Sequence, residues 1–118
     1  MTIENTIPVL PVSNLKRSIR FYTGTLGFTL DWSGVIVCGV SRDGHAIMLW
    51  EESHPPTPTR VWIGLRDHSL FDEYRSRGVK VHQEPRNEVW AYEMKFEDPD
   101  GNILWLGTET RKDLPVNT

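Results

Sequence analysis

The sequence predicts an α+β fold built from two βαβββ modules, and three observations support this prediction. A hairpin with an Asp-Gly turn occurs in each half of the chain, in residues 40–50 and 96–106. Each half also shows the same order of patterns: one strand, one amphipathic helix and three further strands. A proline-rich segment, residues 53–59, separates the two halves. A single βαβββ module leaves one face of its sheet uncovered, so the second module, or a second chain, is expected to cover it.

The hairpin of the second half carries the stronger turn signal. In its turn, Asp98-Pro99-Asp100-Gly101, the proline pre-sets φ at about −65° and the glycine tolerates positive φ. Apolar residues alternate on both sides of the turn, as they do in paired strands. Both outgoing strands carry a late tryptophan, Trp50 in the first hairpin and Trp105 in the second. The sequence therefore predicts a duplicated unit in which these two tryptophans occupy matching places.

The first module spans about residues 5–52. Its first strand, residues 6–12, contains two prolines, which cannot donate to a ladder, so we expect it either at a sheet edge or paired so that the prolines face away from the ladder. Ser13 and Asn14 are both good helix caps. The helix follows from apolar residues at helical spacing and ends at two glycines; these residues are Leu15, Ile19, Tyr22 and Leu26, then Gly24 and Gly27. The remaining strands are predicted at residues 28–32, 35–40 and 45–51.

The second module, about residues 60–108, repeats this order. A strand over residues 60–65 precedes a helix that Asp67, His68 or Ser69 can cap. The apolar side of the helix carries Leu70, Phe71 and Tyr74, and Gly78 ends it. Strands are predicted at residues 79–83, 89–97 and 103–107, and residues 109–118 form a tail that is expected to fray from residue 111.

Composition excludes several classes of function. The chain has 118 residues and a net charge of −3, so it lacks the basic face that nucleic acid requires. No apolar run approaches the roughly 20 residues that cross a membrane, and the N-terminus does not have the pattern of a signal peptide. The single cysteine, Cys38, lies in an apolar strand and predicts a small buried residue in a reducing cytoplasm.

Three elements, in this order and spacing, resemble the vicinal oxygen chelate superfamily. They are Phe21-Tyr22, Leu26-Gly27-Phe28 and Asp98-Pro99-Asp100-Gly101-Asn102. That superfamily includes glyoxalase I, extradiol dioxygenases, fosfomycin resistance enzymes and bleomycin resistance proteins, and the likeness covers residues 7–106. It implies one domain over residues 1–118, with two modules that form cup-shaped mixed β-sheets, completed in a homodimer.

The resemblance also implies where the enzymes of this superfamily would hold a divalent metal. The places lie early in the first strand and late in the last strand of each module. They fall at Ile7 or Pro8, at Trp50, at Arg60 or Val61, and at Trp105. None of these is a metal ligand, and an indole N–H is only a donor. We therefore expect no metal, no cofactor and no catalytic residue; Cys38 has no histidine placed by sequence to activate it.

Tryptophan in place of charged ligands makes the interior of the cup aromatic. We expect a site that stacks a planar or heteroaromatic ligand, lined by Trp50, Trp105, Trp62, Trp90 and Tyr92. Trp50 and Trp105 should approach each other, and Trp90 and Tyr92 share a strand face by period two. Nearby acids are candidates to hold a cationic group of the ligand: Glu51, Glu52, Glu93 and Asp31. Core packing for the tryptophans and solvated surface charge for the acids are the structural alternatives.

The leading hypothesis is thus a metal-independent small-molecule-binding protein of the bleomycin-resistance type, homodimeric and cytoplasmic. The alternative is a metal-dependent lyase, isomerase or dioxygenase with a displaced metal site, drawn from His45, Glu51, His82 or Glu93. A third hypothesis is a module whose tryptophans serve only a protein interface.

Overall fold

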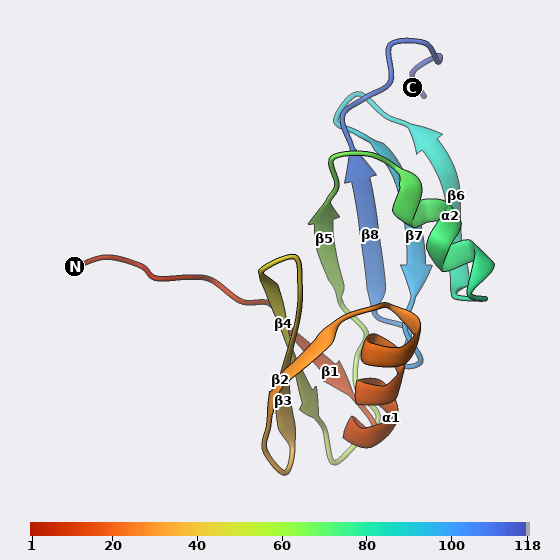
Figure 1. Cartoon of the computed structure of the whole chain (residues 1–118). Coiled ribbons are helices and arrows are strands. Elements are labelled where there is room, and N and C mark those ends of the chain that lie inside the picture. The colour runs from red at the N-terminus through yellow and green to blue at the C-terminus, as the bar shows by residue number, and fades with distance from the viewer. Residues whose placement is uncertain (118) are drawn as a thin grey trace. The chain divides into compact units, whose positions relative to one another are not determined.

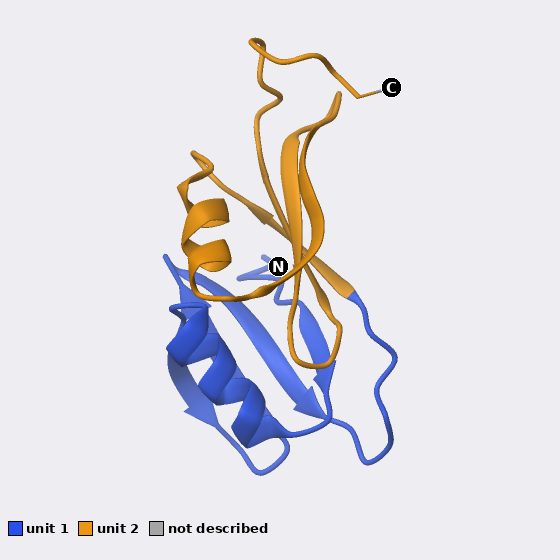
Figure 2. Cartoon of the chain, turned by 90° about the vertical axis from the view of Figure 1, so that its right-hand side faces the viewer, with its two compact units in different colours: residues 1–59 blue, residues 60–118 orange. Residues whose placement is uncertain are grey.

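The structure, a computed structural model, describes residues 1–117 and divides into two compact units, residues 1–59 and 60–118 (Figure 2). Each unit contains one four-stranded mixed sheet and one helical segment after its first strand (Figure 1). This confirms the predicted α+β fold of two βαβββ modules. None of the helices described over residues 1–117 is both long enough and apolar enough to cross a bilayer.

Unit 1 has the strand order β1-β4-β3-β2. Its elements are β1 Val9–Val12, α1 Leu15–Arg20, the π-helical turn η1 Phe21–Thr25, β2 Thr29–Ser33, β3 Val37–Arg42 and β4 His45–Glu51. β1 pairs in parallel with β4 and lies at the edge of the sheet, one of the two arrangements that its prolines predict. The carbonyl of Pro8 accepts from Met48 and that of Val12 accepts from Glu52. Residues 8 and 12 thus make hydrogen bonds to β4 and the residue after it, and Pro11, which lacks an N–H, lies between them.

The first helix begins as predicted and ends differently. The side chain of Asn14 caps it by accepting from the Arg17 N–H at 2.9 Å. Beyond Arg20 the helix widens into the π-helical turn, so Gly24 lies inside the helical segment rather than at its end. Gly27, with φ of 78°, follows the C-cap residue and confirms only the second predicted stop.

Unit 2 has the strand order β5-β8-β7-β6. Its elements are β5 Arg60–Gly64, α2 Ser69–Ser76, β6 Lys80–Asn87, β7 Tyr92–Glu97 and β8 Ile103–Thr108. The Asp67 carboxylate accepts from the Ser69 N–H at the start of α2, and Gly78 follows its end. β6 extends beyond the predicted residue 83 because bulges let this edge strand include Pro85. β7 starts three residues later than predicted, after a turn in which the Glu88 N–H donates to Ala91.

One face of each sheet packs against the helix of its own unit. In unit 1 the fully buried side chains of the strands include Val12, Cys38, Val40 and Leu49. In unit 2 Tyr74 of α2 meets Phe96 of β7 edge to face, with ring centroids 5.8 Å apart. Cys38 is thus the small buried residue that the sequence predicts, and burial raises the pKa of its thiol more than a hydrogen bond with Leu49 lowers it.

The C-terminal tail is bound rather than frayed, which corrects the expectation for residues 111–117. The buried Asn87 amide donates to the carbonyls of Arg111 and Leu114, at 2.9 and 3.1 Å, and accepts from the Arg111 N–H. Farther along, the Asn117 N–H donates to the Asn87 carbonyl. Sequence reasoning could not predict these bonds, because a lone asparagine near a strand end most often marks a turn.

The motif Asp98-Pro99-Asp100-Gly101-Asn102 forms the turn between β7 and β8, and the hydrogen bonds of Asp98 explain its sequence. Asp98 is buried and its Oδ1 accepts from the N–H groups of Asp100 and Asn102, both at 2.9 Å. Its Oδ2 accepts from the Asn102 side chain at 2.9 Å. Gly101 donates to the Asp98 carbonyl and has φ of 82°, so the turn needs glycine there. The motif is therefore a turn held by one buried carboxylate, which is a structural role.

Replacing Asp98 by alanine removes three hydrogen bonds to a charged acceptor in this turn. We expect Asp98→Ala to lower the free energy of unfolding by about 2–4 kcal/mol, measured by urea denaturation. Asp31→Ala, at an exposed position of β2, is the control and should cost less than about 0.5 kcal/mol. Equal effects of the two substitutions would contradict the role assigned to Asp98.

Candidate functional site

The sheet face of unit 2 that points away from α2 carries an aromatic and charged row. Strand residues alternate between faces, so the register that pairs Trp62 with Trp105, Trp105 with Lys95, and Lys95 with Gln83 places all four on one face. Their neighbours Met94, Leu104 and Leu106 are fully buried toward α2. This face, which we call the open face of unit 2, is where the candidate site lies.

A single carboxylate organises the open face. Glu93 of β7 is only 1% exposed. Its Oε1 accepts from two indole N–H groups, that of Trp90 at 2.6 Å and that of Trp105 at 3.0 Å. Its Oε2 accepts from the Gln83 amide at 3.0 Å and lies 3.6 Å from the Lys95 ammonium. Both oxygens are therefore occupied by donors, which offsets the cost of burying the carboxylate.

These donors keep Glu93 ionised. Burial by itself raises the pKa of the Glu93 carboxyl. The hydrogen bonds from Gln83, Trp90 and Trp105, together with the charge of Lys95, lower it by more, so the pKa lies below its usual range. The site thus contains a fixed negative charge that is already paired, rather than a carboxylate available to bind a cation or accept a proton.

The tryptophans around Glu93 form a cluster that we call the tryptophan cluster: Trp62, Trp90 and Trp105. Trp62 and Trp105 meet edge to face, with centroids 5.1 Å apart. The Lys95 ammonium lies 5.1 Å from the Trp105 ring centroid, a cation–π contact that complements the acid beside it. Trp62 and Trp90 remain 47% and 60% exposed. Large apolar rings left this exposed beside a buried, hydrogen-bonded charge are a candidate surface for a ligand.

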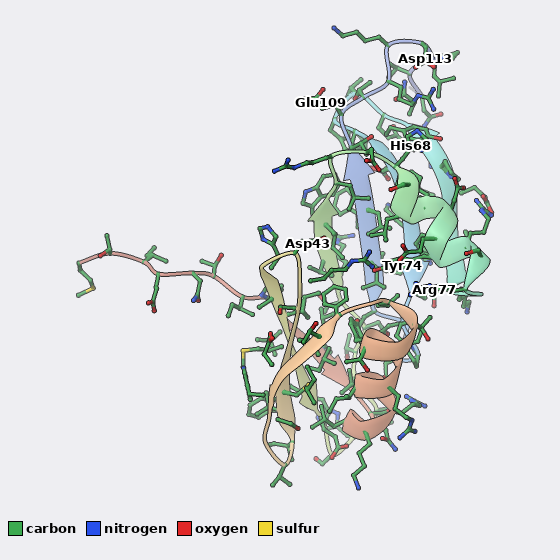
Figure 3. The ribbon with its side chains drawn as sticks, viewed as in Figure 1. Asp43, His68, Tyr74, Arg77, Glu109 and Asp113 are labelled. Carbon is green, nitrogen blue, oxygen red and sulfur yellow. The ribbon has the colours of Figure 1, made fainter. Side chains whose placement is uncertain are left out.

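Tyr92 does not belong to this cluster, although the sequence predicts that it shares a face with Trp90. It stacks on Phe71 of α2 with centroids 5.5 Å apart and contacts His68 edge to face. Arg111 of the tail covers its ring, and His68 and Asp113 lie at the same end of unit 2 (Figure 3). The period-two argument failed because residues 88–91 form a turn before β7, so Trp90 reaches Glu93 from outside the strand.

Trp50 lies in unit 1, at the end of β4, and is 42% exposed. The sequence predicts that it matches Trp105, and this stays a prediction because two counts differ. Counted from the turn glycines Gly44 and Gly101, both with positive φ, the counterpart of Trp105 is Met48. Counted from the first pair of each parallel ladder, Val9 with Met48 and Arg60 with Ile103, Trp50 and Trp105 are both third. The predicted approach of Trp50 to Trp105 concerns two separate units and stays a prediction.

The acids other than Glu93 have local structural roles or exposed positions. The Glu51 carboxylate accepts from the Leu15 N–H at 2.8 Å, at the start of α1, where a negative charge is favourable. Glu52 lies 3.4 Å from His54, and Asp31 is exposed. Of the four predicted acids, Glu93 is the one that belongs to unit 2, and it accepts from two indoles of the tryptophan cluster.

The residues do not fit the divalent metal of the superfamily's enzymes. On the face away from the helix, β4 holds Met48 and Trp50 and β8 holds Trp105. Their partners on the edge strands are Val9, Pro11 and Trp62, and none of these residues is a His, Asp or Glu. Over residues 1–117 no group of three or more His, Cys, Asp or Glu side chains could hold a metal ion. Of the residues proposed for a displaced site, Glu51 and Glu93 have the partners described above. His82 pairs with Glu97 at 3.1 Å, and His45 is exposed.

Sequence reasoning missed the residues that support the tryptophans. Gln83 and Lys95 were not singled out, because only the strand register shows that they flank Trp105. Gly64 and Gly107 were missed as well. A Cβ on Gly107 would lie 2.2 Å from Cη2 of Trp62, and one on Gly64 would lie 3.2 Å from its Nε1. Glycine inside a strand can mark a close approach, and this was the available signal.

Comparison with known proteins gives consistent results. A family described as the Glyoxalase/Bleomycin resistance protein/Dioxygenase superfamily matches residues 6–106. A bleomycin resistance protein from Geobacillus stearothermophilus is 46% identical over 124 aligned positions, which cover 83% of this chain and 91% of that protein. A bleomycin resistance protein from Staphylococcus aureus matches equally well.

Two solved structures show the same fold. An antibiotic-binding protein from a Streptomyces species is 29% identical with a TM-score of 0.77, over 93% of this chain and 99% of that one. The bleomycin-binding protein of Streptomyces verticillus, solved with copper(II)-bleomycin, is 22% identical with a TM-score of 0.78, over 94% of this chain and 99% of that one. The resemblance stated from the sequence motifs is confirmed.

The lowered pKa of Glu93 makes the stability of the protein depend on pH. A carboxyl whose pKa is lower in the folded state stabilises the fold above its unfolded pKa of about 4.3, and this contribution is lost as the pH falls through the folded pKa. We expect Glu93→Gln to lower the free energy of unfolding by about 2 kcal/mol at neutral pH, because an amide cannot accept all four donors. The difference from the native chain should shrink in acid, as measured by urea denaturation against pH.

Glu109→Gln is the matched control, because Glu109 is an exposed residue that follows β8 (Figure 3). Its effect should stay below about 0.5 kcal/mol at every pH. A Glu93→Gln effect that is the same at neutral and acid pH would contradict an ionised Glu93.

Proposed function

The chain belongs to the Glyoxalase/Bleomycin resistance protein/Dioxygenase superfamily, and from this membership we propose that it is a small-molecule-binding protein of the bleomycin-resistance type. It binds a planar or heteroaromatic ligand on the tryptophan cluster without a metal. The observation that carries this proposal is the convergence of three indoles on the open face of unit 2, two of them held by the Glu93 carboxylate.

Relatives support the class of ligand. A relative that is 46% identical, over 83% of this chain and 91% of its own length, is named for bleomycin resistance. A structural neighbour that is 29% identical is an antibiotic-binding protein. Stacking on indole faces needs no metal and tolerates different ring systems, since its strength comes from buried aromatic area. The homodimer and the cytoplasmic location stay predictions from the sequence.

The arrangement supports binding better than catalysis. A general base needs a lone pair that points at the substrate and a pKa close to the working pH. Glu93 meets neither condition, because donors occupy both oxygens and its pKa is lowered. The buried Cys38 has a raised thiol pKa, which opposes formation of the thiolate. No observation favours the lyase, isomerase or dioxygenase alternative.

The tryptophans report binding directly through their fluorescence. We expect metal-free bleomycin, titrated in the presence of EDTA, to give saturable quenching at micromolar or lower concentration. Trp62→Leu should weaken binding by about tenfold, because one aromatic stacking contact contributes about 1.4 kcal/mol. Trp32→Leu is the matched control, since Trp32 in unit 1 is also 47% exposed and also lies on a strand glycine.

Trp50→Leu tests the remaining predicted site residue in the same titration; an effect as large as that of Trp62→Leu would extend the site to unit 1. A flat response from the folded native chain would remove bleomycin as its ligand. Quenching that appears only after a divalent metal is added would contradict metal-independent binding.

A further inference from the structure

The indole of Trp62 packs against two glycines on the open face of unit 2, Gly64 and Gly107, which we call the glycine seat. Its benzene ring lies against Gly107 of β8 and its pyrrole nitrogen lies near Gly64 of its own strand, β5. These two glycines are paired across the parallel ladder. The indole therefore rests on a strip of bare backbone that runs across two strands, while 47% of the residue stays exposed.

Two glycines facing each other in a sheet are unfavourable in themselves. Each loses more backbone entropy on folding than other residues and contributes no side chain to packing. Neither has positive φ, so the backbone would accept alanine at both positions. What forbids a Cβ at Gly107 is the indole of Trp62, which would have to move away from the sheet.

The other tryptophans of the cluster are held by different contacts. Trp105 has the Lys95 ammonium over its ring, contacts Trp62 edge to face, and donates its N–H to Glu93. Trp90 is fixed by its own N–H bond to Glu93. Within residues 1–117, the Trp62 N–H has no hydrogen-bond acceptor. The position of Trp62 therefore depends on the glycine seat and on the edge-to-face contact with Trp105.

We propose that Gly64 and Gly107 are specificity-determining positions: they hold Trp62 low against the sheet, beside Trp105, so that a planar, electron-poor aromatic ring stacks on the exposed side of its indole. The inference rests on the proposed function and deepens it by naming the seat and the ligand chemistry. Electron-poor rings are favoured because the face of an indole is electron-rich, and a heteroaromatic cation is the extreme case. A side chain at residue 107 lifts the indole and closes the space for the ring.

The test uses two small cations of equal charge and different shape. 1-Methylquinolinium is planar, and cyclohexyltrimethylammonium is not. Binding is followed by the indole N–H resonance of Trp62 in ¹⁵N NMR spectra of the full chain, assigned through Trp62→Leu. We expect a saturable shift of this resonance with the quinolinium at a concentration about tenfold lower than with the non-planar cation, which makes a cation–π contact but cannot stack.

Gly107→Ala should weaken quinolinium binding by about tenfold or more, equal to loss of one stacking contact. Gly39→Ala is the matched control: its Cβ would lie 2.3 Å from Nε1 of Trp32, so it displaces an equally exposed tryptophan in unit 1. It should leave the affinity unchanged. If Gly107→Ala does not fold, Gly64→Ala decides, because its Cβ encroaches less, at 3.2 Å, and should give a smaller loss.

The inference is contradicted if the folded alanine variants bind the quinolinium with native affinity. It is also contradicted if the Trp62 resonance of the native chain does not shift when the quinolinium is added. The bleomycin titration separates this failure from failure of the proposed function. If bleomycin still binds with native affinity after Gly107→Ala, the role proposed for the two glycines is contradicted and the proposed function is retained. If the quinolinium stacks but bleomycin does not bind, the role proposed for the two glycines is retained and the bleomycin-type function is contradicted.

Discussion

The candidate site depends on one interaction, the buried carboxylate of Glu93 with its four donors. A buried carboxylate without partners would cost several kcal/mol and would be protonated at neutral pH. Gln83, Lys95 and two indoles remove that penalty, and in return the carboxylate fixes the indoles in place. Three strands, β6, β7 and β8, and the turn before β7 are thereby joined through side chains as well as through the ladder.

This arrangement separates two kinds of tryptophan in unit 2. Trp90 and Trp105 are positioned by polar bonds to an ion, whereas Trp62 is positioned by shape, on the backbone of two paired glycines. Rings that are already held in place lose little conformational freedom when a ligand stacks on them, which favours affinity. Under the proposed function, the same preorganisation lets the indoles orient a ligand without the help of a metal.

The two units share a topology and differ on the face turned away from their helices. In both, an exposed tryptophan lies on a strand glycine, Trp32 on Gly39 and Trp62 on Gly107. Unit 1 has Met48 and Trp50 on that face of β4, and its strand β3, the counterpart of β7, carries no acid. The repeat thus supplies the scaffold twice, while the polar centre is present only in unit 2.

The sequence by itself determined the order of elements, both hairpins and a helix cap at Ser13 or Asn14, and its two prolines limited how β1 can pair. These features depend on local rules: Asp-Gly turns, proline without an N–H, capping side chains and alternating apolar residues. Only the tertiary structure decided that Tyr92 packs against α2, and that Gln83, Lys95, Gly64 and Gly107 support the tryptophans. Register is the reason, because a bulge or turn of one residue changes the face on which every later side chain lies, and the pairing of strands distant in sequence has no local signal.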